Sequence, residues 1–242
     1  MFTFFKRKNQ VEDIGWLGVD MHSHLLPGID DGSPDLEQSL SLIKQLNNLG
    51  FNKFLCTPHI FKELYPNDSD TIMNALDLVK NGLKEKGLVI EIGAAAEYMV
   101  DADFKVTDGL LCLPGNYILI EMSYLSETIG FEQIVFDLKI HGYQVILAHP
   151  ERYNFNHNHL IRFNRYKEIG VLFQLNLLSV CGYYGKEVKL TAEYLLENGL
   201  YDLAATDLHH NRHLHALSKA ITSGFLYKKL GNYNFKNKEL FS

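Results

Sequence analysis

The chain has 242 residues, of which 46% are hydrophobic, 21% charged and 12% aromatic, a composition typical of a folded globular protein. Its 23 basic and 29 acidic side chains give a net charge of −6, which argues against a nucleic-acid-binding protein. The apolar runs are too short for a membrane span, and the opening segment lacks the charge order of a secretory signal. The three cysteines form no CxxC pair, so we expect a reducing, cytoplasmic location.

Short apolar runs that alternate with helical patterns predict an α/β fold with a parallel sheet, either a barrel or an open doubly wound sheet. The predicted strands are Trp16–Met21, Lys53–Thr57, Leu88–Gly93, Tyr117–Met122, Gln144–His149, Val171–Asn176 and Asp202–Thr206. The first helix is predicted to have Ser33 as its N-cap and Pro34 as its first residue, and to end at Gly50. The later helices are predicted at Asp70–Lys86, Glu132–His141, Leu160–Ile169, Val188–Asn198 and Leu214–Thr222.

Each predicted strand ends in, or is soon followed by, a polar residue able to bind a metal ion or phosphate. The carboxyl ends of parallel strands meet at one face, so we expect these side chains to lie together. The metal-binding candidates are His22, His24, His59, Glu97, Glu121, His149, Asp207 and His209, with a further carboxylate from the loop Gly28–Gly32.

These candidate ligands are all nitrogen or oxygen donors, which favours Mn, Fe, Zn or Mg over a structural thiolate zinc site. Because nine ligands exceed the needs of one ion, we expect two or three ions. Several cations at one face activate water and stabilise charge on a transferring phosphoryl group. The pattern therefore indicates a hydrolase, with phosphoesters as the best-fitting substrates.

Two further residues have alternative interpretations. Arg152 lies three residues after His149, where its guanidinium would bind phosphate at two points, or would form a surface salt bridge with Glu151. Asp20 either orients a ligand imidazole or is a polar residue that fills the barrel interior. We expect Cys56 to be a buried hydrophobe. The other histidines are expected at the surface: His141, His157, His159, His210, His213 and His215.

The segments HSHLLPGIDDGS, TPHI, AAAEY, LIEM, AHPERY and TDLHH resemble those of the PHP (polymerase and histidinol phosphatase) metallohydrolase superfamily, and in particular the bacterial CpsB-type protein-tyrosine phosphatases. These segments run from residue 20 to residue 210. The resemblance implies a single-domain, distorted (β/α)7 TIM-like barrel over residues 16–242, preceded by an N-terminal extension of residues 1–15. The opening Phe2, Phe4 and Phe5 beside Lys6, Arg7 and Lys8 indicate either a loosely packed tail or a contact with a membrane or partner.

By position, the resemblance implies a role for each candidate. His22 and His24 match the first metal pair, and Asp31 matches the loop carboxylate. The remaining metal ligands are matched by His59, Glu97, Glu121, His149, Asp207 and His209. Arg152 matches the arginine that binds the phosphoryl group, and catalysis is assigned to Arg152, Asp207 and His209. Mn²⁺ is the implied cofactor, as two or three ions, with Fe, Zn, Co and Mg as the other candidates.

The resemblance implies a metal-dependent phosphotyrosine-protein phosphatase, in which a metal-bridging hydroxide attacks phosphorus. Its implied substrate is the tail of a bacterial tyrosine autokinase of capsule or exopolysaccharide synthesis, so that contact with a membrane is only indirect and nucleic acid is not a partner. Two alternatives stay open. One is a small-molecule phosphatase, such as a histidinol-phosphate phosphatase, and the other is a non-catalytic metal-binding scaffold.

Overall fold

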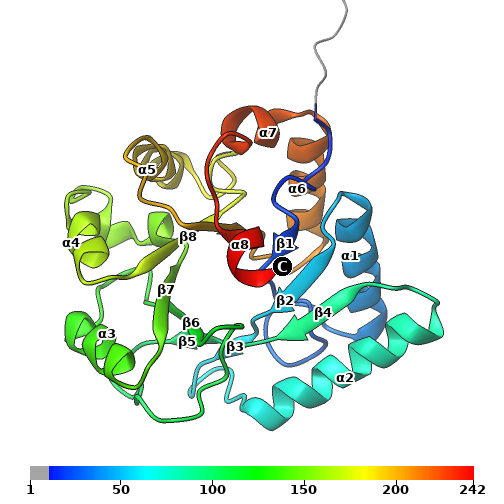
Figure 1. Cartoon of the computed structure of the whole chain (residues 1–242), viewed down its shortest axis with the longest axis horizontal. Helices are drawn as coiled ribbons and strands as arrows, with labels where there is room; N and C mark the ends of the chain where they lie inside the picture. The colour runs from blue at the N-terminus through cyan, green and yellow to red at the C-terminus, as the bar shows by residue number, and fades with distance from the viewer. Residues whose placement is uncertain (1–10) are drawn as a thin grey trace, which may run out of the picture.

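The predicted parallel barrel is confirmed by the computed structural model, which describes residues 11–242 (Figure 1). The charged and aromatic segment Phe2–Lys8 lies outside the described residues. The strands are β1 (Val19–Asp20), β2 (Lys53–Cys56), β3 (His59–Ile60), β4 (Glu91–Ala94), β5 (Glu97–Met99), β6 (Tyr117–Glu121), β7 (Gln144–Ala148), β8 (Leu172–Asn176) and β9 (Leu203–Ala205). All of the paired strands are parallel, as the alternation of strands and helices predicts.

The strands form two hydrogen-bonded sheets, ordered β1-β2-β4 and β3-β5-β6-β7-β8-β9. Together these sheets make one barrel with seven strand positions, here called staves, two of which consist of two short strands each. The second stave consists of β2 and β3, and the third consists of β4 and β5. These two staves stay joined across their interruptions, because Ala95 N donates to Cys56 O at 2.8 Å and Glu97 N donates to Pro58 O at 3.1 Å. A parallel bridge between Ser23 and Leu208 brings the last stave beside the first and closes the barrel.

Six predicted helices are confirmed on the outside of the barrel, and two short ones follow them (Figure 1). They are α1 (Leu36–Asn48), α2 (Ser69–Glu85), α3 (Phe131–Ile140), α4 (Arg162–Glu168), α5 (Lys186–Glu197), α6 (Asn211–Thr222), α7 (Phe225–Leu230) and α8 (Asn237–Phe241). The predicted N-cap of α1 is wrong: Asp35, not Ser33, accepts the Gln38 N–H, at 2.8 Å. Ser33 is buried before the helix, where its backbone N–H donates to His24 O.

The short C-terminal helix α8 closes the amino end of the barrel. Phe241 belongs to the cluster of buried apolar side chains that also contains Val19, Met21 and Ile146, and its ring packs edge-on against Tyr117 at 5.6 Å. Asn237 Nδ2 donates to backbone oxygens of β1 and β9 and so fixes this helix. The apolar residues of this cluster fill the barrel interior, which leaves the carboxyl end of the strands for the polar residues.

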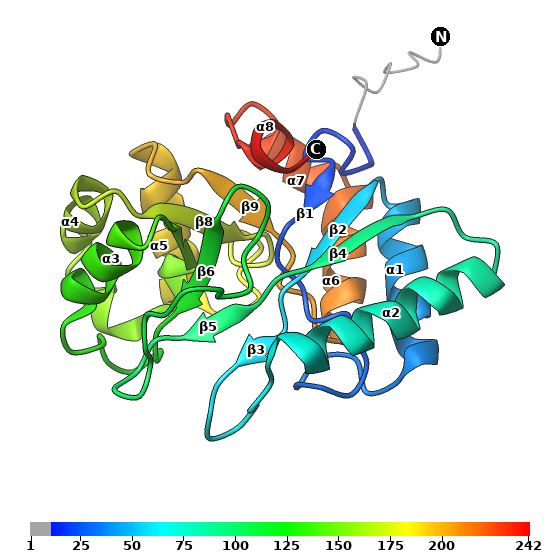
Figure 2. The ribbon, with the colours of Figure 1, turned by 60° about the horizontal axis from the view of Figure 1, so that its bottom comes forward.

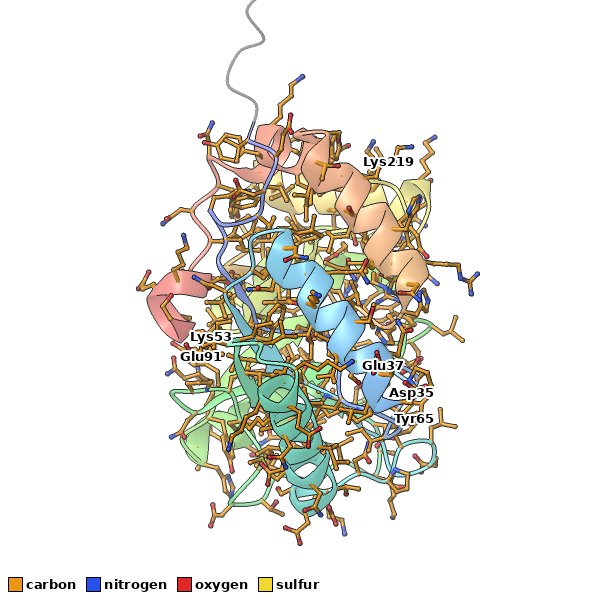
Figure 3. All side chains as sticks on the ribbon, turned by 90° about the vertical axis from the view of Figure 1, so that its right-hand side faces the viewer. Asp35, Glu37, Lys53, Tyr65, Glu91 and Lys219 are labelled. Atoms are coloured by element: carbon orange, nitrogen blue, oxygen red, sulfur yellow. The ribbon has the colours of Figure 1, made fainter. Side chains whose placement is uncertain are left out.

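The helical layer is uneven around the barrel. Figure 3 shows α1 and α6 side by side on one flank, where Gln38 Nε2 donates to Asn211 Oδ1 at 3.0 Å. The connection from β5 to β6, residues 100–116, contains turns and one isolated bridge but no helix, so that no helix covers this side of β3 and β5 (Figure 2). Within residues 11–242, no helix has both the length and the apolar character needed to cross a lipid bilayer.

Candidate metal centre

The structure brings all nine predicted metal ligands together at the carboxyl end of the barrel. Their donor atoms form four overlapping groups, and within each group the atoms lie within 4.8 Å of one another. The groups are His24, Asp31, His59 and His209; His22, His24 and Asp207; His22, Glu97 and His149; and His59, Glu97 and Glu121. Because several residues belong to two groups, the arrangement suits neighbouring ions that share ligands.

Glu97 lies at the centre of this cluster and is fully buried. Its Oε2 lies 3.3 Å from His22 Nε2, 3.4 Å from His24 Nε2 and 3.1 Å from His59 Nδ1, yet it accepts no hydrogen bond. Burial alone would raise the pKa of Glu97, but the charges of the surrounding imidazoles hold it well below its usual range. A buried carboxylate oxygen in this setting needs a cation, so the residues present fit a metal centre.

His149 and Asp207 reach the cluster through an unusual backbone conformation. Their φ angles are 33° and 48°, in the left-handed region that non-glycine residues seldom adopt. His149 directly follows β7, and Asp207 lies two residues after β9. Backbone strain of this kind persists where the surrounding structure enforces it, commonly at functional sites. The strain therefore supports a functional role for both side chains.

The pair His22 and His24 is held in place by Asp30, from the loop predicted to supply a carboxylate, and by Gln174, which the sequence did not identify. The strand β1 ends at Asp20 and the chain bends at His22, so the pair lies beyond the regular strand. His24 Nδ1 lies 2.7 Å from Asp30 Oδ2, and His22 Nδ1 lies 2.9 Å from Gln174 Oε1. These contacts direct both Nε2 atoms towards the cluster, as orienting partners of metal-binding histidines do.

Asp20 proves to be an interior polar residue, the second of its two interpretations. Its carboxylate accepts the Thr206 N–H at 3.0 Å and the Thr206 hydroxyl at 2.6 Å, and it does not hydrogen-bond a ligand imidazole. Burial raises the pKa of Asp20 to about 6. Gln174 takes the orienting role instead, and its one sequence signal is an amide side chain inside the apolar run of β8.

Arg152 faces the metal cluster and does not form the alternative salt bridge with Glu151. Its Nη1 donates to Asp207 Oδ2 at 2.7 Å, and its guanidinium lies between two aromatic rings, 4.6 Å from the centre of Tyr124 and 4.3 Å from that of Tyr184. The side chain is 19% exposed. Cation–π contacts of this kind hold the guanidinium plane in position. The sequence did not indicate either tyrosine: Tyr124 follows β6 by three residues but is not a typical metal ligand, and Tyr184 lies in the connection between β8 and α5.

Glu151 has a structural role behind the cluster. Its fully buried carboxylate accepts hydrogen bonds from Asn176 N at 2.9 Å, Ser179 Oγ at 2.7 Å and Tyr201 OH at 2.8 Å. These bonds fix the short 3₁₀ turn Pro150–Arg152, and with it the position of Arg152.

One prediction about the remaining histidines is wrong. His213 was expected at the surface, but it is buried at the start of α6, with its ring against those of His209 and Tyr183. His213 lies on the buried face of α6, and its distance from a strand end does not predict this burial. Cys56 is buried, as predicted.

The cluster opens into a pocket of about 270 Å³. Charged site residues and apolar or aromatic residues share its wall, which consists of Asp31, His59, Phe61, Leu64, Tyr65, Met99, Glu121, Tyr124, His149, Arg152, Asp207 and His209. The Tyr65 ring stacks on His59, with 5.4 Å between the ring centres, and Leu64 is 64% exposed. The pocket can therefore hold an anion at its base and an aromatic or apolar group at its mouth.

Replacing Asp30 by asparagine is expected to weaken metal binding without unfolding the protein. Asparagine keeps the shape of the side chain but removes the negative charge beside His24, and loss of such a partner lowers metal affinity about 10- to 100-fold. Titration of the metal-free protein with Mn²⁺ measures this change. Asp70→Asn, at an exposed position in the first turn of α2, is the matched control, and equal affinities in the two variants would contradict an orienting role for Asp30.

Comparison with known proteins identifies relatives along almost the whole chain. The model of the family described as "Capsular polysaccharide synthesis, CpsB/CapC" matches residues 18–239. The chain is 28% identical to the tyrosine-protein phosphatase YwqE of Bacillus subtilis over 200 residues, which cover 79% of this chain and 77% of the relative. It is 26% identical to the tyrosine-protein phosphatase CpsB of Streptococcus agalactiae serotype V over 200 residues, which cover 79% and 82%.

Solved structures agree with the observed fold. One described as YwqE from Bacillus subtilis and CpsB from Streptococcus pneumoniae, metal-dependent tyrosine phosphatases, matches with a TM-score of 0.79 and 25% identity, over 92% of this chain and 90% of that chain. The lactonase Lmo2620 from Listeria monocytogenes matches with a TM-score of 0.56 and 13% identity, over 94% and 92%, which is a likeness of fold alone.

Proposed function

The chain belongs to the CpsB/CapC family of capsular polysaccharide synthesis, and from this premise we propose that it is a metal-dependent protein-tyrosine phosphatase. The observation that carries the proposal is the cluster of nine nitrogen and oxygen ligands at one end of the barrel, which opens into a pocket that Arg152 also lines. The likeness to tyrosine-protein phosphatases at 28% and 26% identity supports the choice of phosphotyrosine over a small-molecule phosphoester. The intact ligand set supports an enzyme over a non-catalytic scaffold.

We propose that the nine clustered residues hold two or three Mn²⁺ ions, with Glu97 shared between sites. The ligands are His22, His24, Asp31, His59, Glu97, Glu121, His149, Asp207 and His209. The carboxylate and imidazole donors suit Mn²⁺, with Fe, Zn, Co and Mg as the alternatives.

The chain's own residues account for phosphate binding and orientation. Arg152 is placed to bind phosphoryl oxygens with its forked N–H groups, while Tyr124 and Tyr184 keep the guanidinium plane fixed. Asp207 anchors one edge of that guanidinium. Bound ions would supply an activated water at neutral pH and positive charge for the transferring phosphoryl group. Asp207 and His209 thus take part in catalysis as site ligands beside the reacting phosphate.

The proposed partner is a phosphotyrosine-bearing protein, the tail of a bacterial tyrosine autokinase of capsule or exopolysaccharide synthesis. Membership of a capsular polysaccharide synthesis family supports this choice. We also propose a cytoplasmic location, which the three free thiols of Cys56, Cys112 and Cys181 support, because cysteines in oxidising compartments are commonly paired.

Removing the metal is expected to stop the reaction reversibly. Purified protein should hydrolyse para-nitrophenyl phosphate and a phosphotyrosine peptide, lose both activities in EDTA and recover them with Mn²⁺, since the ions would supply the activated water. Parallel assays with Fe, Zn, Co and Mg identify the best metal.

The same assays distinguish the alternatives. A preference for histidinol phosphate of about a hundredfold would favour the small-molecule phosphatase. Metal-loaded protein that hydrolyses none of these substrates would favour the scaffold.

A further inference from the structure

A second hollow, of about 190 Å³, lies beside the pocket of the metal centre. It lies on the outer side of β3 and β5, where no helix covers the barrel (Figure 2). Ile60 and Tyr98 from these strands line it, together with Phe104 and Leu110 from the connection to β6. Sites for whole small-molecule ligands measure about 300–1,000 Å³, so this hollow has the size for a single side chain.

The hollow and the metal pocket adjoin at one rim. Met99, the last residue of β5, lines both of them. The segment that starts at β3 separates the hollow from the metal pocket, because its successive side chains point to opposite sides. His59 and Phe61 line the metal pocket, whereas Ile60 and Lys62 line the hollow. A chain that leaves the metal pocket over Met99 therefore enters the hollow directly.

The segment between the two spaces is fixed to the metal centre. Phe61 N donates to Tyr65 O at 2.9 Å and Tyr65 N donates to Phe61 O at 2.7 Å, which closes a tight hairpin. Asn67 Nδ2 donates to Ile29 O at 2.7 Å and to His59 O at 2.9 Å, and so ties the base of this hairpin to the loop that carries Asp30 and Asp31. The wall that the hollow shares with the metal pocket is thus fixed to the loop of the metal centre.

The chemistry of the hollow favours an apolar occupant. Five of its nine lining residues are apolar or aromatic, namely Ile60, Tyr98, Met99, Phe104 and Leu110, and the Tyr98 hydroxyl already accepts the Leu111 N–H at 2.7 Å. Four charged residues also line it: Lys62 and Lys105 are positive, and Asp101 and Asp103 are negative. Because these charges balance, the hollow offers no net attraction for an anion or a cation.

We propose that this hollow binds an apolar side chain of the same polypeptide that carries the phosphotyrosine, at a fixed number of residues from it. This inference rests on the proposed function and adds a sequence preference to it. The phosphotyrosine enters the metal pocket, the backbone crosses Met99, and a residue such as leucine fills the hollow. Burying that side chain is expected to raise kcat/KM roughly tenfold over a glycine at the same position.

The test uses the whole metal-loaded protein and a series of phosphotyrosine peptides. A single leucine is moved through each neighbouring position, on both sides of the phosphotyrosine, in a background of glycine and serine. We expect kcat/KM to rise roughly tenfold at one or two adjacent positions and to stay constant at the others. Equal kcat/KM for all of these peptides would overturn the inference and leave the phosphatase assignment intact. Failure to hydrolyse para-nitrophenyl phosphate as well would overturn both.

A variant locates the preference in the hollow. Leu110→Glu is expected to remove the leucine preference, while turnover of para-nitrophenyl phosphate, which has no flanking residues, stays unchanged. Leu190→Glu, at a 48% exposed position on α5, is the matched control and should keep the preference. A preference that persists in Leu110→Glu would overturn the assignment to this hollow. The wild-type peptide series decides the question if the variant does not fold.

Discussion

Glu97→Gln is expected to lower kcat/KM by about a thousandfold or more, because a metal centre contributes several kcal/mol to stabilising the transition state. Glutamine has nearly the same shape as glutamate but lacks its negative charge. The Oε2 atom of Glu97 lies within 3.4 Å of three imidazole nitrogens and accepts no hydrogen bond, so its contribution is the charge that holds cations. The bound metal per protein, measured by elemental analysis, should fall together with the activity.

The matched control for this variant is Glu91→Gln. Glu91 lies on β4, the other part of the same stave, and its carboxylate pairs with Lys53 at 2.7 Å on the exposed surface seen in Figure 3. Surface pairs of this kind contribute at most about 1 kcal/mol to the free energy of unfolding, so metal content and activity should stay at the wild-type level. A Glu97→Gln protein with full metal content and full activity would refute the central place of Glu97.

Arg152→Ala is expected to lower kcat/KM by about 10²- to 10³-fold, the usual cost of removing one group that stabilises developing charge in the transition state. Unlike Glu97→Gln, this variant should keep its metal, since Arg152 is not a ligand. Arg152→Lys should recover only part of the loss. A lysine keeps the positive charge but lacks the planar fork that binds two phosphate oxygens and stacks between Tyr124 and Tyr184.

Arg165→Ala serves as the control for Arg152. Arg165 makes a two-point contact with Glu132 on the surface, with N–O distances of 2.9 Å and 2.7 Å, far from the metal pocket. Activity on para-nitrophenyl phosphate should not change in this variant. Elemental analysis that showed metal loss in Arg152→Ala would contradict a role in phosphate binding, and would assign Arg152 to the support of Asp207 instead.

The sequence pattern by itself determined the parallel α/β sheet and most of the candidate ligands, whereas it left a barrel and an open doubly wound sheet both possible, and only the family resemblance implied the barrel. Apolar runs that alternate with amphipathic helices require a parallel sheet, and in a closed sheet all strand ends meet at one face. A residue such as Glu121 or His149 could therefore be placed near His22 from its position in the chain alone. The N-cap of α1 was predicted at Ser33 because a proline, which suits the first helical position, follows it, and only the backbone geometry selected Asp35.

Tertiary structure alone decided which residues support the site. Gln174 meets His22 across 152 positions of the chain, and Tyr124 and Tyr184 meet at Arg152 from separate connections. Periodicity describes one element at a time, so it carries no information about such pairings. The hollow beside Met99 likewise depends on the absence of a helix between β5 and β6. Regular patterns thus placed the ligands, whereas the side chains that orient them depend on how distant segments pack.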